Sequence, residues 1–147
     1  MLKTTFVIAL IGLVLTLVGC QNTVSDAKIV YMDVAKAKER LSKESARKDI
    51  AVLDARSKAE YDAGHIPGAV YMTPAALPVA EGKTGSGEVV LVDKDLILIY
   101  GSDAGSQLPR AMAKRLLLLS YDDVYVLQGG MREWVRLGGT VSNAAGQ

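Results

Sequence analysis

Cysteine, histidine and net charge are all scarce in this chain. One cysteine and one histidine in 147 residues leave no disulfide within the chain and no cluster of cysteine or histidine metal ligands, so we expect neither a metal nor a cofactor. The 17 basic and 16 acidic residues give a net charge of +1, so no basic surface of the kind that binds nucleic acid is expected. A hydrophobic content of 50% excludes a disordered chain, and the length suits one domain with a short appendage.

The amino terminus contains a short hydrophobic run. Lys3 precedes 13 uncharged residues, Phe6 to Val18, which are too few to span about 30 Å of hydrocarbon as a helix. The run ends in Leu17-Val18-Gly19-Cys20, which resembles the lipobox of bacterial lipoproteins. The resemblance implies that residues 1–19 are a signal peptide, that Cys20 is lipidated, and that the lipid binds the protein to a membrane. An uncleaved anchor or a plain secretory signal is the alternative.

Residues 20–27 are short, polar and without periodicity, so we interpret them as the lipidated cysteine and a tether. The residue after Cys20 is Gln21, whereas lipoproteins held in the inner membrane of diderm bacteria tend to have Asp there. We therefore expect a lipid-anchored protein of the bacterial cell envelope. In a diderm host it would lie on the outer membrane and face the periplasm.

Apolar residues in the remaining chain follow both helical and strand-like patterns. Val34, Ala37 and Leu41 are three or four residues apart, which predicts a helix over 33–46 with Asp33 as its N-cap. Ser57 and Glu60 have the spacing of a capping box, which predicts a short helix over 57–63. We also predict strands over 50–53, 69–72, 96–100 and 124–127, a mobile loop over 81–88, and a last helix over 131–137.

A longer helix is expected over 109–119, with Pro109 in its first turn. Its expected buried stripe consists of Leu108, Met112, Leu116 and Leu119. Strands alternate with helices, and two strands are apolar on both faces. This pattern predicts a single α/β domain over residues 28–143, with a central parallel sheet flanked by helices on both faces.

Two stretches of the chain carry a resemblance to the rhodanese-like domain. The first is Val52-Leu53-Asp54-Ala55-Arg56 with Glu60-Tyr61 and Gly64-His65-Ile66-Pro67-Gly68-Ala69, and the second is Tyr125-Val126-Leu127-Gln128-Gly129-Gly130 with Trp134. The resemblance covers about residues 29–138. It implies an α/β fold and a loop after the strand at 96–100 that wraps an anion with backbone N–H groups. In active members a cysteine opens that loop, takes up sulfur as a persulfide and passes it to a thiophilic acceptor.

Gly101 occupies the position where the resemblance places the cysteine. Glycine has no side chain, and a serine nucleophile needs a neighbouring base, so we expect no catalytic residue. The loop is instead a candidate anion-binding site, in which Asp103 would repel an anion. The candidate residues are Gly101, Ser102, Asp103, Ala104, Gly105, Ser106 and Arg110. An ordinary loop without a ligand is the alternative.

The polar residues of the first motif suit structural roles. Asp54 and Arg56 at the end of a strand can satisfy loop backbone groups and each other, and Glu60 and His65 are interpreted in the same way. Catalytic acid–base roles for these residues are the alternative, and Trp134 is expected in the core.

Three hypotheses for function follow. The first is a non-catalytic rhodanese-like domain, lipid-tethered in the cell envelope, that binds an envelope protein or a small anion. The second is a sulfurtransferase-type enzyme that works without its own cysteine or with the thiol of a partner. The third is a structural envelope lipoprotein without a ligand.

Overall fold

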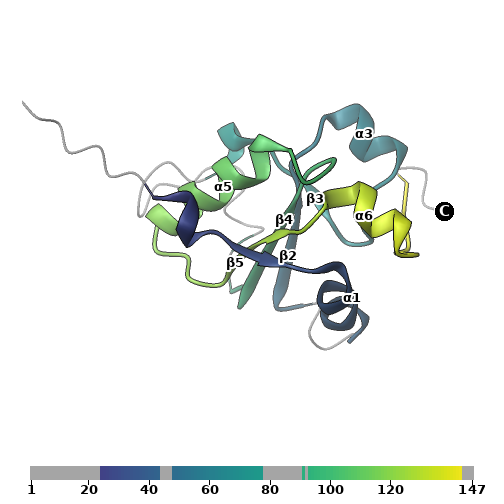
Figure 1. The fold of residues 1–147 in the computed structure, drawn as a ribbon, viewed down its shortest axis with the longest axis horizontal. Coiled ribbons are helices and arrows are strands. Elements are labelled where there is room, and N and C mark those ends of the chain that lie inside the picture. The colour runs from purple at the N-terminus through teal and green to yellow at the C-terminus, as the bar shows by residue number, and fades with distance from the viewer. Residues whose placement is uncertain (1–23, 44–47, 78–90, 92, 144–147) are drawn as a thin grey trace, which may run out of the picture.

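A parallel β-sheet forms the centre of the molecule. The computed structural model describes residues 24–43, 48–77, 91 and 93–143. In these residues the strands are β1 (Val30–Met32), β2 (Ile50–Asp54), β3 (Val70–Tyr71), β4 (Leu96–Tyr100) and β5 (Val124–Leu127). Their order across the sheet is β1-β5-β4-β2-β3, and every pairing is parallel (Figure 1). The central strand β4 is buried at all of its positions, as expected for a strand covered on both faces.

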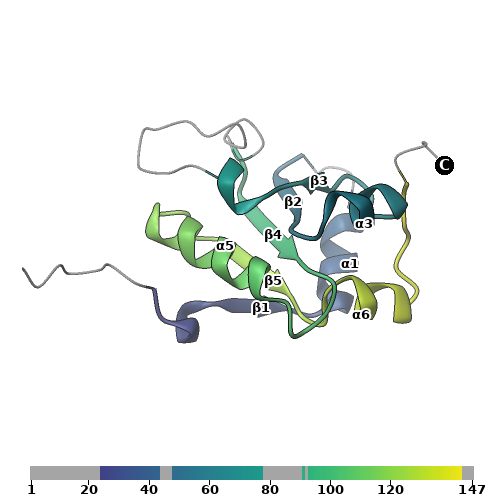
Figure 2. The same cartoon turned by 90° about the horizontal axis from the view of Figure 1, so that it is seen from above.

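Helices cover both faces of this sheet (Figure 2). On one face, α1 (Val34–Ser42) and α6 (Gly130–Arg136) pack against the sheet through residues such as Leu41 and Trp134. On the other face, α5 (Gln107–Leu118) packs through Met112, Ala113 and Leu116. The short helix α3 (Lys58–Ala63) has no buried residue, and two 3₁₀ turns, η1 (Asp26–Lys28) and η2 (Pro74–Ala76), complete the described elements. The predicted α/β fold class is therefore confirmed.

Local capping residues set the starts of two helices as the sequence predicts. The Asp33 carboxylate accepts a hydrogen bond from the Lys36 N–H at 2.7 Å. At α3 the Ser57 hydroxyl accepts from the Glu60 N–H at 3.3 Å, and the Glu60 carboxylate accepts from the Ser57 N–H at 3.1 Å. This reciprocal pair is the predicted capping box.

The helix predicted over 109–119 begins two residues earlier than expected, at Gln107. Pro109 still lies in the first turn, where its missing N–H has no partner to lose. The buried stripe consists of Pro109, Met112, Ala113 and Leu116, which follow a spacing of three and four. Placing Leu108 in the stripe was wrong, because this side chain is 48% exposed although it lies four residues before Met112. Leu119 is the C-cap and is only partly buried.

Several expectations concern residues whose structure is not described. These are the signal peptide, Cys20, Gln21 and the predicted loop at 81–88. The helix predicted over 33–46 is shorter than expected, because it ends at Ser42 and the backbone of Lys43 is already extended. Conversely, β1 is a strand that the sequence patterns did not predict, since they assigned no helix or strand to residues 30–32. In the described part of the chain, no helix has the length and apolar character needed to cross a membrane.

Candidate functional site

The candidate loop lies at the carboxyl end of the central strand. Gly101 follows the last residue of β4, and Ser106 is the N-cap of α5, so the loop links the middle of the sheet to a helix N-terminus. In open parallel α/β sheets, ligands bind beyond the carboxyl ends of the strands. The fold therefore places the sequence-predicted loop where such sites form.

Little space exists for a side chain at Gly101. A Cβ atom placed there would lie 2.5 Å from the Ser106 Cβ, 2.8 Å from the Ser106 Oγ and 2.8 Å from the Pro109 Cγ. These separations are far below the usual 3.5–4.0 Å contact between carbon atoms. Position 101 therefore requires glycine in this conformation of the loop.

The loop uses several of its own N–H groups internally. The Asp103 N–H donates to the Ser106 hydroxyl at 3.1 Å, and the Gly105 N–H donates to the Asp103 carboxylate at 2.9 Å. The Ser106 N–H donates to the Asp103 carbonyl at 3.2 Å. These three N–H groups are satisfied without a ligand, so fewer donors are left to surround an inorganic anion.

The start of α6 holds the loop in place. The N–H groups of Met131 and Arg132 donate to the carbonyls of Gly101 at 2.8 Å and Ser102 at 3.0 Å. Gly130 permits this approach, because a Cβ there would lie 2.5 Å from the Gly101 carbonyl oxygen, and its φ of +60° also favours glycine. The motif that ends in Gly129-Gly130 therefore fixes the first residues of the loop through backbone hydrogen bonds from the start of α6.

Charges in and around the loop are largely compensated. The Asp103 carboxylate pairs with the Arg132 guanidinium at 3.1 Å. The Ser102 hydroxyl donates to the Glu60 carboxylate at 2.8 Å and connects the loop to α3. Hydrogen bonds from the Ser57 hydroxyl, then from the Ser102 hydroxyl, lower the pKa of Glu60 below its ordinary value. Glu60 is therefore a weak base near neutral pH.

A buried polar cluster lies at the ends of β2 and β4. The Asp54 carboxylate is wholly buried and pairs with the Arg56 guanidinium at 2.6 Å, and Arg56 also donates to the Gly64 carbonyl at 2.6 Å. The Tyr100 hydroxyl donates to Asp54 at 2.6 Å and accepts from the Ile66 N–H at 3.2 Å. These bonds tie the signature motif to the strand that carries the candidate loop.

Burial sets the titration of this cluster. Burial and the hydrogen bond to Asp54 both raise the pKa of the Tyr100 phenol well above its ordinary value. Burial is the largest single influence on Arg56 and lowers its pKa, but the hydrogen bond to Asp54, the charge of Asp54 and the contact with Tyr100 together raise the pKa of the guanidinium above its ordinary value. Both groups therefore keep their protons at neutral pH.

His65 contacts backbone and ring atoms. Its Nδ1 lies 2.9 Å from the Tyr61 carbonyl oxygen, to which it donates, and its ring stacks on the Tyr61 ring with centroids 4.0 Å apart. The backbone of His65 also pairs with that of Ser142. These contacts connect α3 to the carboxyl-terminal segment, which is a scaffolding arrangement. Trp134 is 3% exposed, and its ring N–H donates to the Thr140 carbonyl.

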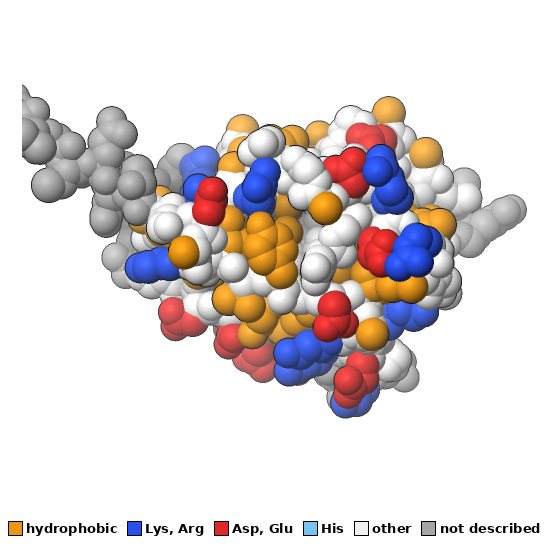
Figure 3. All heavy atoms as spheres, in the orientation of Figure 1, with side chains coloured by type: hydrophobic (Ala, Val, Ile, Leu, Met, Phe, Trp, Pro, Cys, Tyr) orange, Lys and Arg blue, Asp and Glu red, His pale blue; other side chains and the backbone are white. Residues whose placement is uncertain are grey.

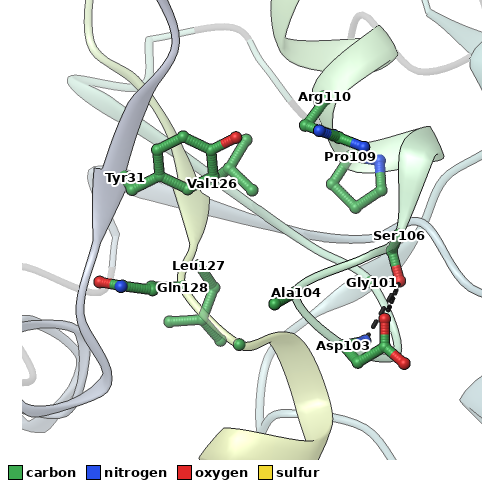
Figure 4. Close-up of a pocket in the computed structure, with 11 residues that line it drawn as sticks. Tyr31, Gly101, Asp103, Ala104, Ser106, Pro109, Arg110, Val126, Leu127 and Gln128 are labelled. Carbon is green, nitrogen blue, oxygen red and sulfur yellow. Dashed lines mark hydrogen bonds between the residues drawn. The ribbon is translucent and has the colours of Figure 1, made fainter.

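Two pockets flank the loop. One has a volume of about 280 Å³ and lies between the loop, the start of α5 and the ends of β1 and β5 (Figure 4). The other has a volume of about 260 Å³ and lies on the α3 side, next to Arg56 and Glu60. Gly101, Ser106 and Pro109 line both pockets. No group of three or more histidine, cysteine or acidic side chains suited to a metal ion occurs among the described residues.

The sequence patterns missed several residues of the larger pocket, among them Tyr31 and Gln128. Tyr31 enters from β1, which is too short and too exposed to give a recognisable strand pattern. Gln128 follows β5 within the second motif, but its spacing alone carries no sign of a pocket. The parallel pairing of β1 with β5 brings Tyr31 to the loop, and the pairing of β5 with β4 brings Gln128 there.

Known structures share this fold. A protein from Bacillus halodurans is similar at 20% identity and a TM-score of 0.63, over 80% of this chain and 79% of that chain. A rhodanese-like domain from Anabaena is similar at 25% identity and a TM-score of 0.61, over 77% of this chain and 78% of that one. A thiosulfate sulfurtransferase from Pseudomonas aeruginosa is similar at 22% identity and a TM-score of 0.61, over 78% of this chain but only 19% of that chain.

The family assignment rests on a match to a family model that spans most of the chain. The model of the rhodanese-like domain family matches residues 34–137, from the start of α1 to the end of α6. This range includes β2, the candidate loop and both motifs singled out in the sequence. The chain therefore belongs to the rhodanese-like domain family.

Proposed function

We propose that this chain is a lipid-anchored rhodanese-like domain of the bacterial cell envelope that binds a protein or a small anion and does not transfer sulfur. The observation that carries the proposal is the filled space at Gly101. In active relatives a cysteine would open the loop, but here a Cβ would lie 2.5 Å from the Ser106 Cβ. The chain's only cysteine is Cys20, so no other thiol can replace it.

The serines of the loop are poor replacements for a cysteine. The Ser102 hydroxyl donates to Glu60, whose lowered pKa makes it a weak base. The Ser106 hydroxyl accepts from the Asp103 N–H and contacts the carboxylate of the same residue at 3.4 Å. Each hydroxyl has only a carboxylate beside it, and each carboxylate is already engaged, Glu60 by Ser57 and Asp103 by Arg132, so neither serine has the free base that an activated serine needs.

A sulfur-transfer assay tests this proposal. The purified chain, supplied with thiosulfate and cyanide, should form no more thiocyanate than a blank. A cysteine-containing rhodanese is the positive control under the same conditions. Turnover by the wild-type chain that is lost in the Ser102→Ala or Ser106→Ala variant would refute the non-catalytic assignment.

The same assay separates the alternatives. Turnover that requires an added thiol would favour an enzyme that works with a partner's sulfhydryl group.

Binding is tested by thermal unfolding with thiosulfate, sulfite, sulfate or phosphate, because a ligand of the folded state raises stability by RT ln(1 + [L]/Kd). The absence of any shift with these anions, together with no protein partner in cross-linking of intact cells, would favour a purely structural lipoprotein.

The lipid anchor is proposed from Leu17-Val18-Gly19-Cys20 and the apolar run before it. Cells that express the chain and are fed radioactive palmitate should label it. Cys20→Ser should abolish the label, and Asn22→Ser serves as the matched control that keeps it. Continued labelling of the Cys20→Ser variant would contradict the assignment.

A further inference from the structure

An open groove lies between α5 and the edge strand β1. α5 packs over β4 and β5 but does not cover β1, so Tyr31 is 49% exposed although it faces the same side of the sheet as the buried Val126. Hydrophobic side chains are exposed over this part of the sheet, and positively charged groups lie beside them (Figure 3). The exposed tyrosine is thus one wall of the larger pocket beside the loop.

The pocket combines an apolar floor with polar groups at its rim. Val126 and Leu127 lie between Tyr31 on one side and Pro109 with Ala104 on the other (Figure 4). Arg110 lies across from the Tyr31 ring, and Gln128, Ser106 and Asp103 add polar atoms. A volume of about 280 Å³ is just below the range of about 300–1,000 Å³ that is usual for small-molecule sites, so it suits a compact ligand.

Arg110 supplies the charge that is left uncompensated in this pocket. Asp103 is paired with Arg132 and accepts the Gly105 N–H, and Asp26, the other acid that interacts with Arg110, is paired with Lys114. Within the described part of the chain, Arg110 itself makes neither an ion pair nor a side-chain hydrogen bond. A guanidinium in this state can pair with a ligand's acid group through two parallel hydrogen bonds.

We infer that this pocket binds a small organic anion, a carboxylate or sulfonate on a compact apolar body. The acid group lies on the Arg110 guanidinium, and the apolar body packs over Val126 against the Tyr31 ring. Inorganic oxyanions fit less well, because the Asp103, Gly105 and Ser106 N–H groups that could surround them are bound within the loop. The inference names the ligand class of the proposed binding function and rests on that function.

Benzoate is a suitable probe, and benzyl alcohol is its neutral counterpart of similar shape. The full chain, uniformly labelled with ¹⁵N in detergent micelles, is titrated with sodium benzoate, benzyl alcohol or sodium sulfate at constant ionic strength. Benzoate should shift the amide signals of Tyr31, Ala104 and Gln128 with a saturable dependence on concentration. Benzyl alcohol and sulfate should bind at least about tenfold more weakly, the factor expected from losing one charge-assisted hydrogen bond or the apolar contact.

Two pairs of variants assign the binding to this pocket. Arg110→Gln should raise the Kd for benzoate about tenfold or more, whereas Arg40→Gln, an exposed arginine of α1 that does not line this pocket, should leave it unchanged. Tyr31→Ala should also weaken binding, whereas Val30→Ala on the same strand should not, since Val30 is equally exposed but does not line the pocket.

Several results would overturn the inference. They are saturation by sulfate at lower concentration than by benzoate, equal affinity for benzoate and benzyl alcohol, an unchanged Kd in Arg110→Gln, and no saturable shift at any concentration of benzoate. None of these binding results would show that the chain transfers sulfur, so each of them would leave the proposed non-catalytic function intact. Conversely, sulfur transfer by the wild-type chain would refute that function whether or not benzoate binds.

Discussion

Replacing Gly101 with alanine should destabilise the domain by an amount set by the crowding at this position. The added methyl group would lie 2.5 Å from the Ser106 Cβ and 2.8 Å from the Pro109 Cγ, so the loop or the start of α5 must move. Overpacking of this kind costs about 1–3 kcal/mol. In a domain of this size, each kcal/mol lowers the melting temperature by about 4 °C.

A double-variant cycle locates the cause of this loss. Ser106→Gly removes two of the three close contacts, those with the Ser106 Cβ and Oγ, but leaves the contact with Pro109. The Gly101→Ala/Ser106→Gly variant should therefore be more stable than the sum of the single effects by about 1 kcal/mol, which is within the usual range for residues in contact. Urea unfolding followed by circular dichroism measures all four free energies of unfolding.

The matched control is Gly105→Ala in the same loop. A Cβ at Gly105 would have its nearest neighbour, the Asp103 carboxylate, at 3.4 Å, so this change should stay within about 0.5 kcal/mol of the wild type. If Gly101→Ala were as mild as Gly105→Ala, or if the effects of Gly101→Ala and Ser106→Gly simply added, the space for a nucleophile would not be filled. The structural reason for the non-catalytic proposal would then be lost.

Three further predictions concern the polar groups around the loop. Arg56→Met should cost about 3–5 kcal/mol in urea unfolding, because it leaves the buried Asp54 carboxylate without its partner; a loss below 1 kcal/mol would contradict the buried ion pair. Burial raises the pKa of Tyr100 above 10.0, so its neutral phenol contributes stability that is complete below pH 10 and lost as the pH rises further. Tyr100→Phe should therefore flatten the stability profile above pH 10, and an unchanged slope would argue against this reasoning. The pKa of Glu60 is lowered from 4.5, so its carboxylate contributes stability above that pH that is lost as the pH falls. Glu60→Gln should reduce the loss of stability in acid, and an equal loss in both proteins would show that the bonds to Ser57 and Ser102 contribute nothing.

Features set by residues close together in sequence could be predicted. The capping box needs only Ser57 and Glu60 three residues apart, and the N-cap at Asp33 needs only the next turn of backbone. The apolar run at 96–100 predicts a strand covered on both faces, and the structure has β4 there, buried throughout. In each case the information lies within one element.

Features that depend on pairing between distant segments could not be predicted. β1 has only three residues, two of them exposed, and it becomes a strand because it pairs with β5 about a hundred residues later. Tyr31 joins the pocket through that pairing alone. Likewise, the sequence shows that Gly101 has no side chain, but not that Ser106 and Pro109 fill the space where one would lie.

The filled space changes what the absence of a cysteine means. If Gly101 bordered an empty cavity, one substitution could restore a thiol in a loop still shaped to receive it. Here the Ser106 and Pro109 atoms occupy that volume, and the loop N–H groups of Asp103, Gly105 and Ser106 bond within the loop. We therefore propose that a ligand of this domain is held beside the loop rather than within it, in the pocket that Arg110 and Tyr31 line.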